Sequence, residues 1–227
     1  QLSIIVGEKL VSQFDLKPGD RIAMLATNEL EAVVLFFASL RCGSVLVPIN
    51  FRLTRREIDH VTADCEPKVF LAQSAFTEIV NTLELKKNNP IAVWKFEEFQ
   101  ALVNAALSDV RTRKNPSTAK NATAISLNSD QPCMILYTSG TTGAPKGAMI
   151  TPRMLHWNSL NTTLRLNLSE NDVFVNFLPF FHTGGWNVLL TPFVHRGATT
   201  VLTKKFDADH VLKLCESEKA TIMFGVP

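Results

Sequence analysis

Short apolar runs alternate with longer segments of helical periodicity along most of the chain. Runs at residues 21–26, 44–49, 68–72 and 91–94 predict buried strands, and the segments between them carry apolar side chains at helical spacing. Strands that alternate with helical crossovers are typical of a parallel sheet covered by helices on both faces. The pattern therefore predicts an α/β fold in which largely parallel sheets are flanked by helices in Rossmann-like layers.

Capping residues mark several helix starts. Three starts carry such a signal: Asn28 with Glu31, Thr54 with Glu57, and Thr151 followed by Pro152. In the second half the same alternation predicts strands at 132–137, 147–151, 172–178, 198–203 and 221–224. Helices are predicted between them at 152–166, 183–195 and 207–219, the last of which begins at Asp207.

A polar stretch divides the chain into two parts. Four basic side chains between residues 111 and 120 are compatible with an anion-binding patch, but the Asn, Pro and Ser residues beside them favour a solvated linker. We therefore predict a first α/β subdomain over residues 1–110, a linker over 111–131, and a second α/β subdomain over 132–227.

Composition and charge narrow the class of protein. The 227 residues are 46% hydrophobic and 19% charged, as in a folded protein, and the net charge of +2 gives no basis for nucleic-acid binding. The four cysteines and five histidines show neither paired nor metal-ligand spacing, so neither a disulfide framework nor a metal site is predicted. Reduced thiols and the lack of a signal-peptide pattern predict a cytoplasmic protein.

The strongest chemical signal lies between the strands predicted at 132–137 and 147–151. Hydroxyls, glycines and a lysine gather there: Thr138, Ser139, Gly140, Thr141, Thr142, Gly143 and Lys146. Glycines let backbone N–H groups converge on an anion, hydroxyls add donors and the lysine adds positive charge, so the loop predicts a phosphate-binding site. It is not a Walker A loop, because Pro145 and Gly147 replace the glycine and the hydroxyl of that motif.

These residues carry a family resemblance. Residues 137–147 resemble the signature phosphate loop of the adenylate-forming superfamily, which includes acyl-CoA synthetases, peptide-synthetase adenylation domains and luciferases. Residues 40–50 are similar to the family's L-K-x-G-x-x-x-x-P-[IL]-[DN] segment, with Arg41 in place of the usual lysine. Residues 178–186 resemble its P-x-F-H-x-x-G segment, and 225–227 resemble the start of its G-V-P-[TS] strand. The resemblance covers the whole chain.

The resemblance implies an ATP-dependent, AMP-forming reaction. In this family's synthetases a carboxylate attacks the α-phosphorus of ATP, and the acyl-adenylate then reacts with the thiol of coenzyme A. ATP, Mg²⁺ and coenzyme A are therefore the implied cofactors. The family's Mg²⁺-binding motifs and its C-terminal domain with a catalytic lysine are absent from this chain, so we expect part of the large N-terminal domain, inactive by itself.

The resemblance also suggests a substrate pocket. Its implied lining is Phe181, His182, Gly184, Trp186, Val226 and Pro227. His182 is implied as the catalytic histidine that positions the substrate carboxylate, and Trp186 matches a gating tryptophan of some long-chain fatty acyl-CoA synthetases; core packing is the alternative for both. No Asp or Glu lies between Asp172 and Asp207, so the ammonium of an amino acid would be unpaired and an apolar carboxylic acid is expected.

Three other interpretations stay open at this point. The chain could belong to an aryl-acid CoA ligase, to a peptide-synthesis adenylation domain, or to a non-catalytic protein that keeps the scaffold for binding. Residues 173–194 lack charged side chains, but Asn176 and Pro179 among them argue against a membrane-spanning helix. Peripheral membrane contact, acyl-chain length, oligomeric state and organism are not determined by the residues.

Overall fold

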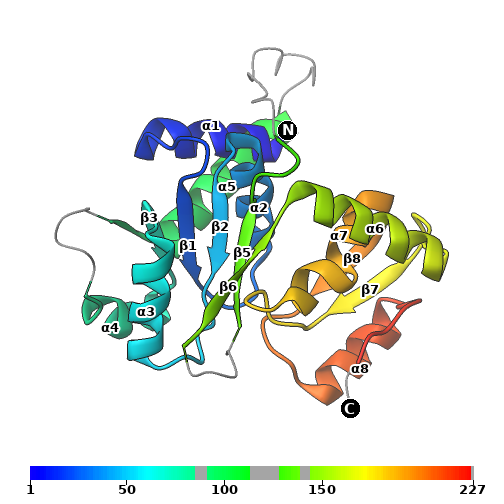
Figure 1. Ribbon diagram of the computed structural model, residues 1–227. Coiled ribbons are helices and arrows are strands. Elements are labelled where there is room, and N and C mark those ends of the chain that lie inside the picture. Colours follow the sequence, from blue (N-terminus) through cyan, green and yellow to red (C-terminus); the bar gives the residue numbers. More distant parts are fainter. Residues whose placement is uncertain (85–90, 113–127, 139–143, 226–227) are drawn as a thin grey trace. The chain divides into compact units, whose positions relative to one another are not determined.

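A computed structural model describes residues 1–84, 91–112, 128–138 and 144–225 of the chain. These residues form two compact units (Figure 1). The first unit comprises Gln1–Ala26 and Leu30–Thr151, and the second comprises Thr27–Glu29 and Pro152–Pro227. Each unit has its own sheet and its own buried core, so the two are described separately.

In its described part, the first unit is organised by a six-stranded sheet of order β4-β3-β1-β2-β5-β6. The strands are β1 (Arg21–Leu25), β2 (Val45–Pro48), β3 (Val69–Ala72), β4 (Ala92–Lys95), β5 (Met134–Thr138) and β6 (Lys146–Ile150). Neighbouring strands run parallel except β5 and β6, which are antiparallel because their connection is too short for a crossover helix. The sheet confirms the predicted, largely parallel α/β fold.

Helices lie on both faces of this sheet (Figure 1). One group of helices packs together: α1 (Leu2–Phe14), α2 (Leu30–Cys42) and α5 (Phe96–Thr112). The other face carries α3 (Arg55–Cys65), the 3-10 turn η1 (Ser74–Phe76) and α4 (Thr77–Asn81), where Ile58 and Val61 of α3 share a core cluster with Leu25 and Phe70. Because both faces are covered, β2 and β3 are buried at every position, and their sequences are continuous apolar runs.

Helix α3 is fixed at both ends. At its start, the predicted capping box is present: the Glu57 N–H donates to Thr54 Oγ1 over 3.4 Å, and the Thr54 N–H donates to the Glu57 carboxylate over 2.7 Å. Hydrogen bonds from the Thr54 hydroxyl and N–H lower the pKa of Glu57. At its end, the Arg21 guanidinium donates to the carbonyls of Cys65 and Glu66, each over 2.6 Å, and complements the negative end of the helix dipole.

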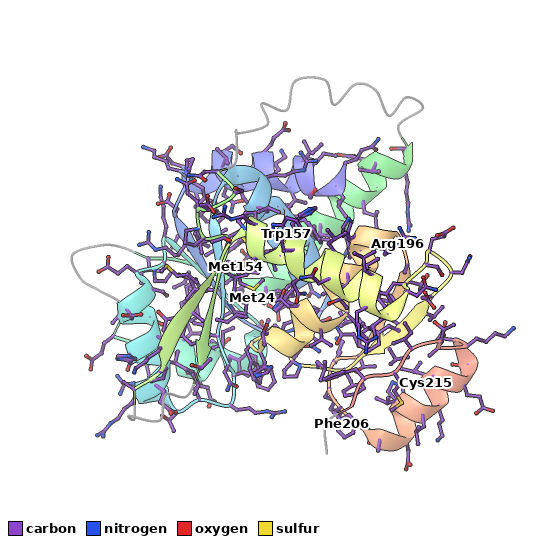
Figure 2. The ribbon with its side chains drawn as sticks, turned by 45° about the vertical axis from the view of Figure 1, so that its right-hand side comes forward. Met24, Met154, Trp157, Arg196, Phe206 and Cys215 are labelled. Atoms are coloured by element: carbon purple, nitrogen blue, oxygen red, sulfur yellow. The ribbon has the colours of Figure 1, made fainter. Side chains whose placement is uncertain are left out.

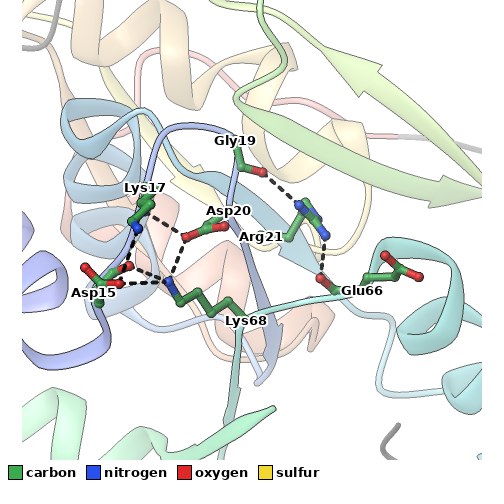
Figure 3. Close-up of polar contacts among 7 residues, drawn as sticks. All are labelled: Asp15, Lys17, Gly19, Asp20, Arg21, Glu66 and Lys68. Carbon is green, nitrogen blue, oxygen red and sulfur yellow. Dashed lines mark hydrogen bonds and ion pairs between the residues drawn. The ribbon is translucent and has the colours of Figure 1, made fainter. Parts of the chain in front are cut away.

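Arg21 belongs to a polar cluster at the edge of the sheet where the parallel strands begin (Figure 3). The cluster consists of Asp15, Lys17, Gly19, Asp20, Arg21, Glu66 and Lys68. Lys68 Nζ lies 3.2 Å from Asp20 Oδ2 and donates to the Asp15 carbonyl. Asp15 and Glu66 end α1 and α3 in the left-handed region, with φ of 48° and 43°. The cluster therefore ties two helix ends to the starts of β1 and β3.

The described residues of the second unit contain a two-stranded parallel sheet of β7 (Val173–Asn176) and β8 (Thr199–Leu202). Its helices are α6 (Pro152–Leu166), the π-helical turn η3 (Gly184–Val188), α7 (Leu190–Arg196) and α8 (Ala208–Ser217). Leu168, Phe174, Leu189 and Phe193 form the buried core. Asp207 caps α8 as predicted, because its carboxylate accepts the His210 N–H over 2.8 Å.

Several large apolar side chains of this unit are on its surface (Figure 2). Met154 and Trp157 of α6 and Phe206 after β8 are each more than half exposed. Residues 173–194, the stretch without charged side chains, are divided among β7, a turn, η3 and α7. Within the described ranges, no helix is long and apolar enough to cross a membrane.

Three expectations about the elements differ from the structure, and one helix was not expected. Residues 132–151 do not begin a second subdomain, because β5 pairs with β2 and completes the sheet of the first unit. A single bridge between Phe174 and Ile222 occurs where a strand over 221–224 was predicted. Helix α5 extends to Thr112, into the predicted linker, and 113–127 lie outside the described residues. Helix α1 was not predicted at all.

Candidate functional site

The predicted phosphate loop joins the two strands of an antiparallel hairpin in the first unit. Thr138 ends β5 and Lys146 begins β6, and the two residues are register partners, so their side chains lie on the same face. Both residues are exposed. Ser139, Gly140, Thr141, Thr142 and Gly143 lie outside the described residues. The structure therefore brings together the two ends of the predicted loop, which we call the hairpin mouth (Thr138 and Lys146).

Side chains of α3 hold the hairpin close to its mouth. The Tyr137 hydroxyl donates to the Asp64 carboxylate, and His60 Nε2 lies 3.3 Å from the Pro145 carbonyl oxygen. Burial and the hydrogen bond to Asp64 raise the pKa of Tyr137 far above its usual range, so this hydroxyl stays a donor. Both strands that flank the loop are thus attached to the same helix.

Position 147, directly after Lys146, has no room for a side chain. A Cβ at this position would lie 2.7 Å from Ile135 Cγ2 and 3.1 Å from Tyr137 Cζ. From the sequence, Gly147 was identified only as part of the phosphate-loop motif. The structure adds a steric reason, since the glycine allows the Tyr137 ring to lie across β6.

The predicted histidine lies in a tight turn of the second unit, here called the His182 turn (residues 178–185). The His182 N–H donates to the Pro179 carbonyl over 3.1 Å, and the Gly185 N–H donates to the His182 carbonyl over 3.0 Å. His182 Nδ1 accepts the Gly184 N–H over 3.0 Å. Because Nδ1 is an acceptor, the proton of the neutral ring is assigned to Nε2. The exposed imidazole therefore presents an N–H donor at Nε2.

Two glycines make this turn possible. A Cβ on Gly185 would lie 2.4 Å from the Pro179 carbonyl oxygen, which is closer than real Cβ contacts. A Cβ on Gly184 would lie 3.2 Å from His182 Nδ1, against the atom that accepts its N–H. Gly184 was predicted as a site residue. Gly185 was not, although the consecutive glycines were a usable signal.

Trp186 has a packing role in this structure. It is fully buried, its ring stacks on Phe180 at a centroid distance of 4.4 Å, and its Nε1–H donates to the Phe180 carbonyl. Phe181, the neighbouring predicted pocket residue, is partly buried. Val226 and Pro227 lie outside the described residues. A gating role for Trp186 would require this stacked pair to separate.

Two buried asparagines complete the turn, and neither was predicted as a functional residue. Asn176 Nδ2 donates to the Gly185 carbonyl over 3.0 Å, and its Oδ1 accepts the Leu178 N–H over 3.1 Å. Asn28 Nδ2 donates to the Leu178 carbonyl over 2.9 Å, and its Oδ1 accepts the Phe180 N–H over 3.0 Å. Asn28 was read as the cap of the following helix. Its amide takes part in these bonds, and α2 begins two positions later, at Leu30.

The hairpin mouth belongs to the first unit and the His182 turn to the second. No group of three or more His, Cys, Asp or Glu side chains that could hold a metal ion occurs in the described parts of either unit. Chemically, the hairpin mouth offers a cation and a hydroxyl to an anion, and the turn offers an oriented imidazole donor.

Comparison with known proteins gives a consistent picture. The AMP-binding enzyme family matches residues 6–227. Feruloyl-CoA synthase of an Amycolatopsis species is 31% identical over 93% of this chain and 39% of that protein. Long-chain-fatty-acid–CoA ligase FadD13 of Mycobacterium tuberculosis is 28% identical over 96% of this chain and 41% of that protein. The chain thus spans about two fifths of the length of these curated relatives.

Solved structures share the fold. ATP-bound MatB from Rhodopseudomonas palustris is 28% identical with a TM-score of 0.82, over the whole of this chain and 42% of that one. The inhibitor-bound N-terminal domain of FACL13 from Mycobacterium tuberculosis is 25% identical with a TM-score of 0.84, over the whole of this chain and 54% of that one. The α/β fold described here therefore matches that N-terminal domain.

Proposed function

The chain belongs to the AMP-binding enzyme family, and from this premise we propose that it is the N-terminal part of an ATP-dependent, AMP-forming acyl-CoA synthetase. Its substrate would be a fatty or other apolar carboxylic acid. The observation that carries the proposal is the hairpin mouth, where Thr138 and Lys146 are paired in register at the two ends of the phosphate-loop sequence.

The proposed reaction has two steps. In the first, a carboxylate oxygen attacks the α-phosphorus of ATP, the bond to the β-phosphate oxygen breaks, and pyrophosphate leaves with that electron pair. In the second, the sulfur of coenzyme A attacks the acyl carbon, AMP leaves, and the thiol proton passes to water or a base. Both steps develop charge on phosphate oxygens, so positioning and charge neutralisation supply most of the catalysis.

The hairpin mouth would act on the phosphates. Lys146 carries a compact positive charge, and Thr138 presents a hydroxyl donor on the same face of the hairpin. Tyr137 and His60 would keep the two strand ends at a fixed spacing through their bonds to Asp64 and Pro145. Mg²⁺ would reduce the charge of the ATP phosphates, and we propose that its protein ligands belong to family motifs that residues 1–227 do not contain.

His182 would position the acid. Its Nδ1 is occupied by the Gly184 N–H, so its Nε2–H is the atom able to donate to an anionic oxygen. A donor of this kind would stabilise a carboxylate or phosphate oxygen by a hydrogen bond. The role requires the ring to stay in one orientation, which the hydrogen bond from Gly184 favours.

The character of the acid follows from the second unit. No Asp or Glu occurs between Asp172 and Asp207, so a substrate ammonium would find no partner there. Phe181, which is partly buried beside the turn, favours an apolar body. An aryl acid is the second candidate, because the feruloyl-CoA synthase is 31% identical and the fatty-acid ligase 28%.

Two assays test the proposal. The isolated chain, given ATP, Mg²⁺, coenzyme A and a fatty acid, should release no sustained pyrophosphate, and sustained release contradicts the inactivity of this part alone. A protein extended to the length of its relatives should form acyl-CoA from apolar acids and leave amino acids unreacted. A panel of aliphatic and aromatic acids ranked by kcat/KM then separates the fatty-acid candidate from the aryl-acid candidate.

A further inference from the structure

We propose that Asn28 is a positioning residue for His182, although it lies more than 150 positions earlier in the sequence. The inference rests on the proposed function, because it concerns the orientation of the ring that would meet the acid. Asn28 lies between β1 and α2 in sequence, but residues Thr27–Glu29 belong to the second unit. The residue is 4% exposed, and its side-chain amide is hydrogen-bonded to residues of that unit.

Both side-chain N–H groups of Asn28 donate hydrogen bonds. Nδ2 donates to the Leu178 carbonyl over 2.9 Å and to the Thr203 carbonyl over 3.2 Å, while Oδ1 accepts the Phe180 N–H over 3.0 Å. The Asn28 amide therefore bonds the carbonyl of the residue before Pro179 and the N–H of the residue after it. An aspartate has the same shape but places a carboxylate oxygen against two carbonyls, and an alanine leaves the three backbone groups without this partner.

These bonds reach His182 through a short series of contacts. Pro179, held between the two Asn28 contacts, offers its carbonyl to the His182 N–H over 3.1 Å. The Phe180 carbonyl is held by the Trp186 indole, while the Phe180 N–H is held by Asn28. Asn28 thus fixes the peptide groups on which the His182 backbone depends. The ring itself is then oriented by the Gly184 N–H.

Asn28 and Glu29 also contact residues that follow the carboxyl end of β8. Asn176 ends β7 and Thr203 follows β8, and the Thr203 N–H donates to the Asn176 carbonyl over 3.0 Å. Glu29, beside Asn28, pairs with Lys204 over 2.9 Å, and the Glu29 side chain is 11% exposed. The carboxyl edge of parallel strands is where α/β folds place their ligands. Asn28 therefore fixes the backbone at the edge where a ligand is expected.

A substitution series tests the proposal in the protein that is extended to the length of its relatives, here called the relative-length protein. Asn28→Asp should lower kcat for acid-dependent adenylation by about 10- to 100-fold, with the KM for ATP changed less than about threefold, since misplacement by about 1 Å costs rate rather than nucleotide binding. Asn28→Ser, which keeps one donor and acceptor, should retain more activity. Asn171→Asp, on an exposed loop of the same unit, is the matched control and should leave kcat unchanged.

A second readout does not depend on activity. Hydrogen exchange at the Phe180 amide should accelerate at least tenfold in Asn28→Asp and Asn28→Ser, with exchange at the Leu136 amide of β5 unchanged. The ¹⁵N shifts of the His182 ring should show mixed tautomers where the parent protein shows the Nε2–H form. Unchanged exchange and ring shifts, or a loss of kcat no larger than the loss of folded protein, would overturn the proposal.

The two hypotheses fail in different ways. If the parent protein adenylates no acid in the panel, the proposed function is wrong, and the exchange and ring shifts still decide whether Asn28 holds the turn. If the parent protein is active and Asn28→Asp keeps full kcat while folded, the positioning role is wrong and the function stands.

Discussion

The hairpin mouth and the His182 turn are both expected to meet the substrate, but they are held in different ways. The hairpin depends on a regular antiparallel ladder and on two contacts to α3, and most of β6 is exposed. In the His182 turn, four backbone groups are bound by the buried amides of Asn28 and Asn176. A loop that wraps a polyphosphate needs only fixed ends, whereas a ring that orients an acid needs a fixed backbone.

The largest effect is expected at the hairpin mouth. Lys146→Ala should slow adenylation in the relative-length protein by about 10²- to 10³-fold, because it removes a charge that stabilises phosphate oxygens in the transition state. The free energy of unfolding should change by less than about 0.5 kcal/mol, since the side chain is exposed. Single-turnover acyl-adenylate formation measures the first effect, and urea unfolding measures the second.

Lys213→Ala on the exposed part of α8 is the control for that substitution. It removes the same charge from the chain and should leave both measurements at the parent values. If Lys146→Ala adenylates at the parent rate, the phosphate-loop assignment is wrong.

A substitution in the His182 turn should lower the stability of the protein. Gly185→Ala should lower the free energy of unfolding by about 3 kcal/mol, because the new Cβ would lie 2.4 Å from the Pro179 carbonyl oxygen and the turn must open. Gly225→Ala is the matched control, since no atom lies within 4 Å of its Cβ position. Equal urea midpoints for the two variants would contradict the close packing of the turn.

A smaller stability effect is expected beside the hairpin mouth. Tyr137→Phe keeps the ring but removes the donor to Asp64, which should cost about 1.5 kcal/mol because the acceptor is a charged carboxylate. The double variant with Asp64→Ala isolates the pair through a double-mutant cycle in urea unfolding. A coupling energy near zero would show that α3 does not hold the hairpin through this bond.

The smallest effect concerns the base of the same hairpin. Burial raises the pKa of the Cys133 thiol to about 12, and the thiol lies 3.4 Å from the Ile150 carbonyl oxygen. Because the thiolate is the reactive form, Cys133 should resist alkylation even at pH 10, whereas the less buried Cys215 should react in the folded protein. Mass spectrometry after labelling at pH 8 and pH 10 checks this, and Cys215→Ser should remove the rapid reaction.

The two regions also differ in how far the sequence predicts them. The capping box of Thr54 and Glu57 and the strands of the first unit depend on local patterns, and each was predicted. The antiparallel pairing of β5 with β6 was not predicted. Helix α1 lacks a side-chain cap hydrogen bond at Gln1, so no residue marked its start. The local pattern of Asn28 and Glu31 indicated a cap, but the partners of the Asn28 amide are Leu178, Phe180 and Thr203, and contacts over that separation are set by tertiary packing.

The division into units shows the same limit. The polar stretch before β5 looked like a boundary, because linkers are polar. The pairing of β5 with β2 instead adds the hairpin to the first sheet, and a pairing between Leu46 and Met134, which are 88 positions apart, leaves no local signal in the sequence.

Acid-dependent exchange of labelled pyrophosphate into ATP tests the central claim most directly. A relative-length protein that carries this chain should catalyse the exchange with apolar carboxylic acids, should not do so with amino acids, and should lose it on Lys146→Ala. Exchange that is absent with every carboxylic acid tested, or that persists in Lys146→Ala, would contradict the account.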